Sequence, residues 1–211
     1  MIVVGLTGNY GMGKSTIARM FRELGAATID TDDIVRELLT EPALILEIKN
    51  AFGEDIVDKE TVNKHMLAGI VFNYPHLRIS LENILHPRVF RKVDEKVEAL
   101  RSGGARLVIV EAPVIFERGY QNRFDKVVTV YTSEETAVER LKAKGVSGEN
   151  ALNRLKSQFP VAMKLSGSDF SIDNGDDIKK TRERVEFIYR ELTALDQGEP
   201  GGPAKRNYGN N

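Results

Sequence analysis

The sequence contains no cysteine and no tryptophan, and it has only three histidines among 211 residues. The absence of cysteine excludes disulfides, thiolate zinc sites and cysteine nucleophiles. Three histidines leave few ligands for a metal cluster. The net charge is only −1, from 30 Lys and Arg against 31 Asp and Glu. We therefore do not expect the chain to coat a nucleic acid or an anionic membrane through its overall charge.

Long apolar runs are also missing. None approaches the ~18 residues needed to span a bilayer. The N-terminus begins directly with the apolar residues 1–4, without the basic segment of a signal peptide. Apolar residues make up 41% and charged residues 29% of the chain, which is enough to bury a core. We expect a folded cytoplasmic protein with no membrane and no nucleic-acid partner, and any anion it binds must be held at a local site.

Short apolar runs typical of strands buried on both faces recur along the chain. They lie at residues 2–7, 27–29, 107–110, 126–131 and 170–172. Helical patterns follow most of them. We interpret this alternation as an α/β fold, a parallel sheet flanked by helices.

One motif near the N-terminus points to phosphate binding. The segment Gly-Asn-Tyr-Gly-Met-Gly-Lys-Ser at residues 8–15 fits the pattern G-x-x-x-x-G-K-[ST] in full. A predicted buried strand precedes it and an amphipathic helix follows, so backbone N–H groups can surround a phosphate there. An ordinary glycine-rich turn with an exposed lysine is the alternative, but a complete and correctly placed match disfavours it.

The motif assigns particular roles to two side chains. Lys14 can reach the β- and γ-phosphates, and the Ser15 hydroxyl can ligate Mg²⁺. The sequence therefore predicts a site for ATP or another nucleoside triphosphate together with Mg²⁺. The predicted binding residues in this stretch are Gly8, Asn9, Tyr10, Gly11, Met12, Gly13, Lys14, Ser15 and Thr16.

Two aspartates, Asp30 and Asp32, follow the second predicted strand. Reacting groups in open α/β sheets gather beyond the carboxyl ends of the strands. A carboxylate there can orient an acceptor hydroxyl and take its proton. The other interpretation, that Asp30 or Asp32 only caps the next helix, stays open. Asp33 is expected to be a surface charge at the start of that helix.

The segment 140–164 is rich in basic side chains, most of which we expect on solvated helix faces. Small kinases close a basic lid over the transferred phosphoryl group, where a positive side chain offsets the transition-state charge and closure excludes water. Arg140 is the strongest candidate for that role, because its helix follows directly on a strand.

The middle of the chain, 41–103, lacks strand-like runs. Helices are expected at 43–52, 60–73, 76–85 and 87–101, with a helix junction at His86-Pro87. We predict four parts. They are a nucleotide-binding core (1–40, 104–136 and 165–197), a helical insertion that binds the acceptor (41–103), a small lid (137–164) and a flexible tail (198–211).

The combined pattern resembles the dephospho-CoA kinase family, a family of P-loop kinases. The shared landmarks run in the family's order from residue 1 to about 195. They are the phosphate loop, Ile29–Asp32, His86-Pro87, Pro113–Glu117, Arg140, Gln158, Lys164 and Asp169–Gly175. The resemblance implies a P-loop kinase fold and ATP-dependent phosphorylation of the ribose 3′-hydroxyl of dephospho-CoA, the last step of coenzyme A synthesis.

The resemblance also implies residue roles. Asp32 matches the aspartate that engages the 3′-hydroxyl, Lys14 and Ser15 match the phosphate and magnesium residues, and Asn174 and Gly175 lie near the adenine of ATP. The sequence departs from the family pattern in three places. Asn9 replaces a glycine and is the next most tolerant residue if that position needs a positive φ. Lys144 replaces a lid arginine, keeping the charge but losing the planar guanidinium, and Val114-Ile115 replaces a leucine pair.

Two other functions fit parts of the pattern. One is a small P-loop kinase that acts on a nucleoside monophosphate or a small alcohol. The other is a nucleotide-dependent switch or assembly ATPase with a protein partner. The sequence contains no Asn-Lys-x-Asp motif of the kind that guanine-nucleotide switches use to read the base.

Overall fold

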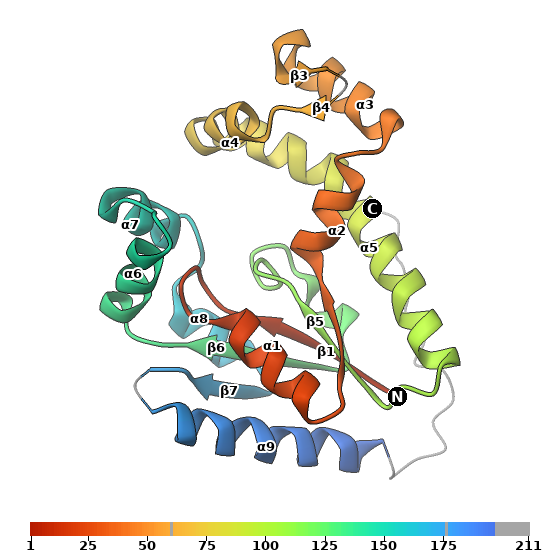
Figure 1. Cartoon of the computed structure of the whole chain (residues 1–211), viewed down its shortest axis with the longest axis vertical. Helices are drawn as coiled ribbons and strands as arrows, with labels where there is room; N and C mark the ends of the chain where they lie inside the picture. The colour runs from red at the N-terminus through yellow and green to blue at the C-terminus, as the bar shows by residue number, and fades with distance from the viewer. Residues whose placement is uncertain (60, 176, 197–211) are drawn as a thin grey trace. The chain divides into compact units, whose positions relative to one another are not determined.

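A computed structural model of the chain describes residues 1–59, 61–175 and 177–196. Its central feature is a five-stranded sheet with the strand order β2-β5-β1-β6-β7 (Figure 1). The strands are β1 (Ile2–Thr7), β2 (Ala27–Asp30), β5 (Leu107–Glu111), β6 (Lys126–Tyr131) and β7 (Phe170–Asp173). β1 pairs in parallel with both β5 and β6, and β6 pairs in parallel with β7. The predicted strands and the α/β fold are confirmed.

The described residues group into two compact units. The first combines Met1–Ile29 with the described residues from Ala99 onward, and the second is Asp30–Glu98. The four-part division given above remains a prediction, and its tail, 198–211, lies outside the described residues. Within the described ranges, no helix has the length and apolar character to cross a bilayer.

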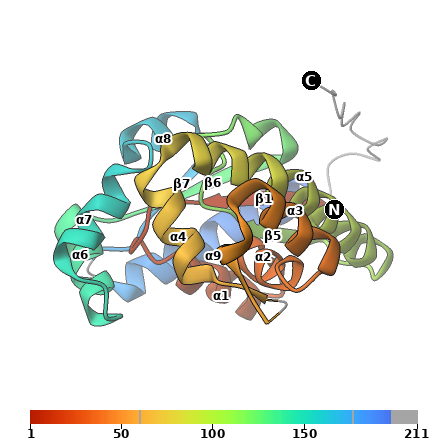
Figure 2. The same ribbon diagram turned by 90° about the horizontal axis from the view of Figure 1, so that it is seen from above.

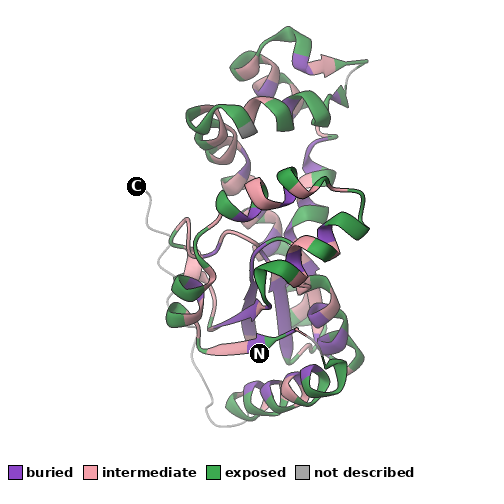
Figure 3. Cartoon of the chain, turned by 90° about the vertical axis from the view of Figure 1, so that its left-hand side faces the viewer, coloured by how far each residue is buried: buried purple, intermediate pink, exposed green. Residues whose placement is uncertain are grey.

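In the first unit, two helices cover one face of the sheet. They are α1 (Lys14–Glu23) and α9 (Ile178–Leu195). Alternate strand residues such as Leu6 and Val128 point to this face and pack against Phe21 of α1 and Ile188 of α9, all fully buried. The strands accordingly lie in the buried layer, while the outer faces of the helices remain exposed (Figure 3).

The opposite face of the sheet is covered by the segment 112–124 and by α8 (Val161–Gly167), a helix the sequence did not predict. Chain segments approach closely here. A Cβ atom on Gly5 would lie 2.6 Å from Ile115 Cδ1 and 2.7 Å from Phe124 Cδ2. The segment includes the 3-10 turn η2 (Tyr120–Arg123). Glycine at position 5 therefore lets this loop pack directly on β1.

Two further helices, α6 (Glu134–Ala143) and α7 (Gly148–Lys156), lie side by side (Figures 1 and 2). The hydroxyl of Ser133 accepts a hydrogen bond from the Thr136 N–H and caps α6, as its capping sequence predicts. α7 ends at Lys156. Pro160 disfavours a helical conformation at the preceding residue, so 157–160 forms a connection between α7 and α8.

The second unit is mainly helical. Its elements are α2 (Thr31–Leu38), α3 (Pro42–Phe52), η1 (Glu54–Ile56), β3 (Val57–Asp58), β4 (Thr61–Val62), α4 (Lys64–Asn73) and most of α5 (Pro75–Ser102). The prediction of no strands was wrong, because β3 and β4 form a short antiparallel pair with Val57 opposite Val62. The helix predicted from residue 60 begins at Lys64, since the Asn63 side chain accepts the Met66 N–H and caps it.

The predicted helix junction at His86-Pro87 was also wrong, because α5 runs through Pro87 without a break. Proline lacks an N–H group and removes one helical hydrogen bond. Buried side chains on both sides of it, Leu85 and Val89, keep the two halves packed along one continuous helix. His86 packs edge-on against Phe90, and burial lowers the pKa of its imidazole.

Candidate active site

The phosphate loop connects β1 to α1, and its backbone needs two of its glycines. Gly11 (φ 75°) and Gly13 (φ 89°) lie in the left-handed region. A Cβ atom would stand 2.4 Å from the Ala137 carbonyl oxygen at Gly11 and 2.0 Å from Asn174 Nδ2 at Gly13. No other residue type fits either position, so the chain turns tightly around the N-terminus of α1.

The N-terminus of α1, which is the positive end of the helix dipole, lies at the end of the loop. Gly13 is the N-cap residue and contributes no side-chain hydrogen bond, so the first N–H groups of the helix have no capping side chain. Lys14 Nζ donates to the carbonyl oxygens of Gly8 at 3.0 Å and Asn9 at 3.5 Å. The ammonium group thus lies beside the loop that the backbone N–H groups form, an arrangement suited to polyphosphate.

Ser15 faces a carboxylate that the sequence analysis missed. Its Oγ donates to Glu111 Oε1 at 2.9 Å. Glu111 is the last residue of β5, and the strand register sets it opposite Leu6, just before the loop. The signal that could have found Glu111 is the one used for Asp30 and Asp32, an acidic residue at the end of a predicted buried strand.

The oxygens of Ser15 and Glu111 are of the type that Mg²⁺ prefers. Within the described ranges, no group of three or more His, Cys, Asp or Glu side chains could hold a metal ion. A protein site with few oxygen ligands fits Mg²⁺, which is usually held in part by substrate phosphates and water. The residues present therefore fit a magnesium–nucleotide complex rather than a metal held by protein ligands alone.

Three predicted residues from later in the chain gather at the other side of the loop. Asn174 is buried, and its Nδ2 donates to the Met12 carbonyl oxygen at 2.9 Å. Arg140 Nη2 donates to the Gly175 carbonyl oxygen at 3.0 Å. A Cβ atom on Gly13 would lie 3.6 Å from Arg140 Nη1. The structure therefore brings Arg140, Asn174 and Gly175 together with the phosphate loop.

Two buried polar atoms in this region, Arg140 Nη1 and Thr132 Oγ1, make no hydrogen bond to any described residue. Thr132 is the residue directly after β6, and its Oγ1 would lie 3.6 Å from a Cβ atom on Gly175. Buried polar groups are ordinarily paired. These two atoms are therefore suited to receive polar groups of a bound ligand.

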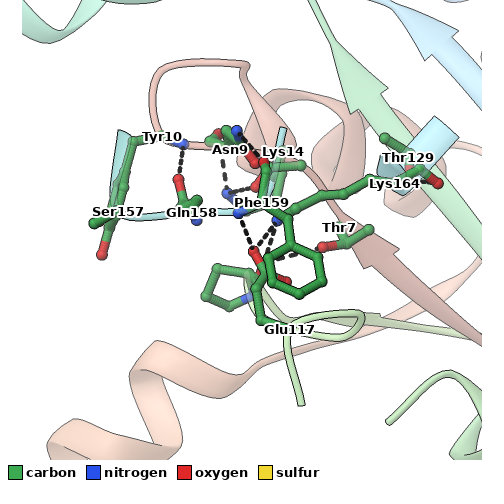
Figure 4. Close-up of polar contacts among 12 residues, drawn as sticks. Thr7, Asn9, Tyr10, Lys14, Glu117, Thr129, Ser157, Gln158, Phe159 and Lys164 are labelled. Carbon is green, nitrogen blue, oxygen red and sulfur yellow. Dashed lines mark hydrogen bonds and ion pairs between the residues drawn. The ribbon is translucent and has the colours of Figure 1, made fainter. Parts of the chain in front are cut away.

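Asn9 uses its side chain rather than an unusual backbone conformation. Lys59 is the one non-glycine with a positive φ in the described part of the chain, so Asn9 does not need the left-handed region. Its amide is buried, and Nδ2 donates to the Phe159 carbonyl oxygen at 3.0 Å (Figure 4). The residue that departs from the family pattern thus links the phosphate loop to the segment before α8.

In the second unit, the two candidate aspartates have different local roles. Asp30 is the N-cap of α2, and its Oδ1 accepts the Asp32 N–H at 2.8 Å. The capping interpretation therefore applies to Asp30. Asp32 lies exposed in the first turn, directly after β2, and Asp33 pairs with Arg36 on the helix surface. The catalytic role of Asp32 stays a prediction.

Lys164 is an exception to the expectation that most basic residues of 140–164 lie on solvated helix faces. Its side chain is 0% exposed and pairs with Glu117, with 2.6 Å between Nζ and Oε1. Burial lowers the pKa of Lys164, while the hydrogen bond and the charge of Glu117 raise it. By contrast, Lys144 is exposed at the C-cap of α6, as expected for most of this segment.

The phosphate loop at the carboxyl end of a central parallel strand, with helices on both faces of the sheet, defines a P-loop kinase fold. The sequence matches the family described as dephospho-CoA kinase over residues 2–180. The chain belongs to the dephospho-CoA kinase family.

Individual relatives agree with the family match. The dephospho-CoA kinase of Aquifex aeolicus is 35% identical over 192 residues, covering 90% of this chain and 97% of that protein. A crystal structure from Thermus thermophilus is similar with a TM-score of 0.80 and 30% identity, covering 90% of this chain and 97% of that one. Dephospho-CoA kinase from Campylobacter jejuni has a TM-score of 0.68 and 29% identity, covering 92% and 98%.

Proposed function

We propose that the protein transfers the γ-phosphoryl group of ATP to the ribose 3′-hydroxyl of dephospho-CoA, which yields coenzyme A and ADP. The observation that carries this proposal is the family match over residues 2–180, which includes every predicted site residue. The loop geometry supports the ATP half of the reaction. We also propose a cytoplasmic location, which suits a biosynthetic kinase family.

ATP is held with its phosphates in the loop. The backbone N–H groups of residues 8–15 and the first turn of α1 surround the β-phosphate, and Lys14 Nζ moves from the Gly8 and Asn9 carbonyls to the β- and γ-phosphates. Ser15 Oγ and, beside it, Glu111 would hold Mg²⁺, which would neutralise charge on the phosphates. Asn174 and Gly175 lie beside the adenine.

Asp32 acts on the acceptor. Its exposed carboxylate accepts a hydrogen bond from the 3′-hydroxyl, orients the oxygen towards the γ-phosphorus and takes the hydroxyl proton. The new bond joins the 3′-oxygen to the γ-phosphorus, while the bond between the γ-phosphorus and the β–γ bridging oxygen breaks. ADP leaves with the electron pair of that bond. The segment 41–103 binds the rest of dephospho-CoA.

Arg140 and Lys14 stabilise the charge that spreads over the transferred group. The Arg140 guanidinium already has one nitrogen bonded to Gly175, and its buried Nη1 can donate to a phosphate oxygen. The segment 137–164 acts as the lid that excludes water, which would otherwise accept the phosphoryl group.

The test is a direct transfer assay with the purified protein, ATP, Mg²⁺ and dephospho-CoA. We expect ADP and coenzyme A to form in equal amounts, with the new phosphate identified on the 3′-oxygen by phosphorus NMR. An analogue of dephospho-CoA with 3′-deoxyribose should accept no phosphate. Turnover of a nucleoside monophosphate at a higher rate than dephospho-CoA would contradict the proposal, as would phosphorylation of the 3′-deoxy analogue.

A further inference from the structure

A cluster of polar contacts beside the phosphate loop joins three segments of the first unit (Figure 4). We call it the loop clamp, defined as Asn9, Glu117, Gln158, Phe159 and Lys164. Asn9 belongs to the phosphate loop, Glu117 follows β5, and the other three come from the connection 157–160 and from α8. None of the catalytic roles proposed above uses Glu117, Gln158, Phe159 or Lys164.

The centre of the loop clamp is the ion pair between Glu117 and Lys164. The two side chains are 11% and 0% exposed. Lys164 Nζ also donates to the Pro113 carbonyl oxygen at 2.9 Å, and the Thr7 hydroxyl donates to that same oxygen at 3.1 Å. Both the loop after β5 and the last residue of β1 are therefore connected to this pair.

The ion pair holds one peptide segment in place. The Phe159 N–H donates to Glu117 Oε1 at 3.2 Å, and the Phe159 carbonyl oxygen accepts the Asn9 amide at 3.0 Å. On the preceding residue, Gln158 Oε1 accepts the Tyr10 N–H at 2.8 Å. The carboxylate thus fixes Phe159, and the segment 158–159 in turn holds two successive residues of the phosphate loop.

Stability alone is a weak reason for such a pair. Replacing a buried ion pair by apolar side chains of similar volume is often neutral or stabilising. A carboxylate, however, can accept hydrogen bonds from a fixed direction, which an apolar side chain cannot. The contribution specific to this pair is therefore the orientation of Phe159 and, through it, of Asn9 and Tyr10.

We propose that Glu117 and Lys164 are positioning residues. They hold the phosphate loop in the conformation that binds the diphosphate group of a nucleotide. They act through Phe159 and Asn9 and touch no substrate atom. The inference rests on the proposed function only in taking the loop as the nucleotide site. Disrupting the Glu117–Lys164 pair should change the affinity for nucleotide, because the loop contacts the phosphates in the ground state as well as in the transition state.

Two variants separate positioning from stability. Glu117→Gln keeps an oxygen for the Phe159 N–H but leaves Lys164 without its counter-charge. The double variant Glu117→Leu with Lys164→Met removes both charges and the acceptor together. If the loop clamp positions the loop, the first variant is the less stable one but retains nucleotide affinity. The second is the more stable of the two but binds the nucleotide weakly.

The measurement is ADP binding by calorimetry in the presence of Mg²⁺, together with urea unfolding of each variant. We expect the double variant to raise the Kd for ADP about tenfold, which is ~1.4 kcal/mol of binding free energy. We expect Glu117→Gln to change it less than about threefold. Asn9→Ala, which removes the amide that holds Phe159, should weaken ADP binding to a similar extent as the double variant. Lys126→Gln serves as the control. Lys126 is the first residue of β6, and it forms a 2.8 Å ion pair with Asp169 outside the loop clamp.

Affinity that follows stability across the variants would overturn the inference, because the pair would then only hold the fold together. Wild-type affinity in the double variant would overturn it as well. If wild-type protein itself fails to bind ADP, the proposed function fails first, and the positioning role fails with it. An effect of Lys126→Gln as large as that of the double variant would also contradict a role specific to the loop clamp.

Discussion

In the first unit the Glu117–Lys164 pair leaves 11% and 0% of its side chains exposed, whereas the Lys96–Glu37 pair of the second unit leaves 47% and 54% exposed. Breaking a buried pair by removing one partner typically destabilises a protein by ~3–5 kcal/mol. An exposed pair contributes ~0–1 kcal/mol. The Glu117–Lys164 pair is therefore a structural constraint, whereas the Lys96–Glu37 pair is a minor surface feature.

The difference reflects what each unit has to hold in place. The phosphate loop needs backbone groups at fixed positions, and hydrogen bonds supply that constraint. Asn174 donates to the Met12 carbonyl oxygen, while Gln158 Oε1 accepts from Tyr10 and the Phe159 carbonyl oxygen accepts from Asn9. The second unit is held by apolar packing along α5, for example by Val89 and Val93, while its Lys96–Glu37 pair lies on the surface. Substitutions of charged residues should accordingly have larger effects near the loop than in the helical unit.

The largest effect is expected from Lys14→Ala. The substitution removes the cation beside the phosphates, so turnover should fall by a factor on the order of 10⁴. Lys14 Nζ donates hydrogen bonds to carbonyl oxygens of the loop itself, so the thermal unfolding midpoint should stay near that of the wild type. Steady-state kinetics and circular dichroism melting give the two quantities. An unfolded variant would show that Lys14 is structural.

Asp32→Asn tests whether one charged residue of the second unit has a large effect after all. Asp32 is an exposed residue of that unit, yet we assign it the acceptor hydroxyl. Loss of the carboxylate should lower kcat by a factor on the order of 10³ while the affinity for ATP changes little. Asp33→Asn is the matched control, because Asp33 pairs with Arg36 on the surface. An equal loss of kcat and of ATP affinity would point to a magnesium role instead.

Glu117→Gln measures how much the Glu117–Lys164 ion pair contributes to the stability of the protein. The uncompensated Lys164 should lower the free energy of unfolding by roughly 3 kcal/mol at neutral pH. Burial lowers the pKa of Lys164 below the ordinary value of 10.5. The unfolded state therefore binds more protons than the folded state in this pH range. The loss of stability in Glu117→Gln should shrink as the pH rises towards 10.5. Urea unfolding at several pH values provides the test, and a deficit that grows with pH would contradict the assignment.

Lys96→Ala measures the corresponding contact in the second unit. Because both partners of the Lys96–Glu37 pair are about half exposed, the free energy of unfolding should change by less than ~1 kcal/mol. The same denaturant experiment applies. A loss as large as that of Glu117→Gln would remove the distinction between the two units.

The smallest effect concerns pH and His86. Burial lowers the pKa of this imidazole, so the unfolded state takes up a proton before the folded state does. Stability that is present above pH 6.5 should fall as the pH drops below that value, and His86→Gln should reduce this fall. Thermal melting between pH 5 and pH 8 follows the change.

The sheet and the phosphate loop were accessible from the sequence because their signals are local. A buried parallel strand is a continuous apolar run, and the loop needs glycine at fixed positions such as Gly13. The continuous helix α5 was not accessible, since the tendency of Pro87 to end a helix is a local signal. The packing of Leu85 and Val89 that overrides it depends on the whole unit.

The site was accessible in part for the same reason. Lys14, Ser15 and Asn174 belong to recognisable motifs, whereas Glu111 becomes relevant only once the strand register sets it opposite Leu6. The contacts of Phe159 are made by its backbone, so its side-chain identity carries no signal. The burial of Lys164 depends on Glu117, which lies 47 positions earlier, and spacing along one helix cannot reveal such a partner.

The place of β1 in the sheet has a consequence for how the protein is made. Its two neighbours, β5 and β6, are synthesised about a hundred residues later, as the pairing of Ile2 with Leu107 illustrates. While the chain emerges from the ribosome, the first strand has neither neighbour available, and pairing between such distant segments is slow. The loop residues proposed to bind the nucleotide are thus translated before the strands that flank β1, and they acquire their final conformation late.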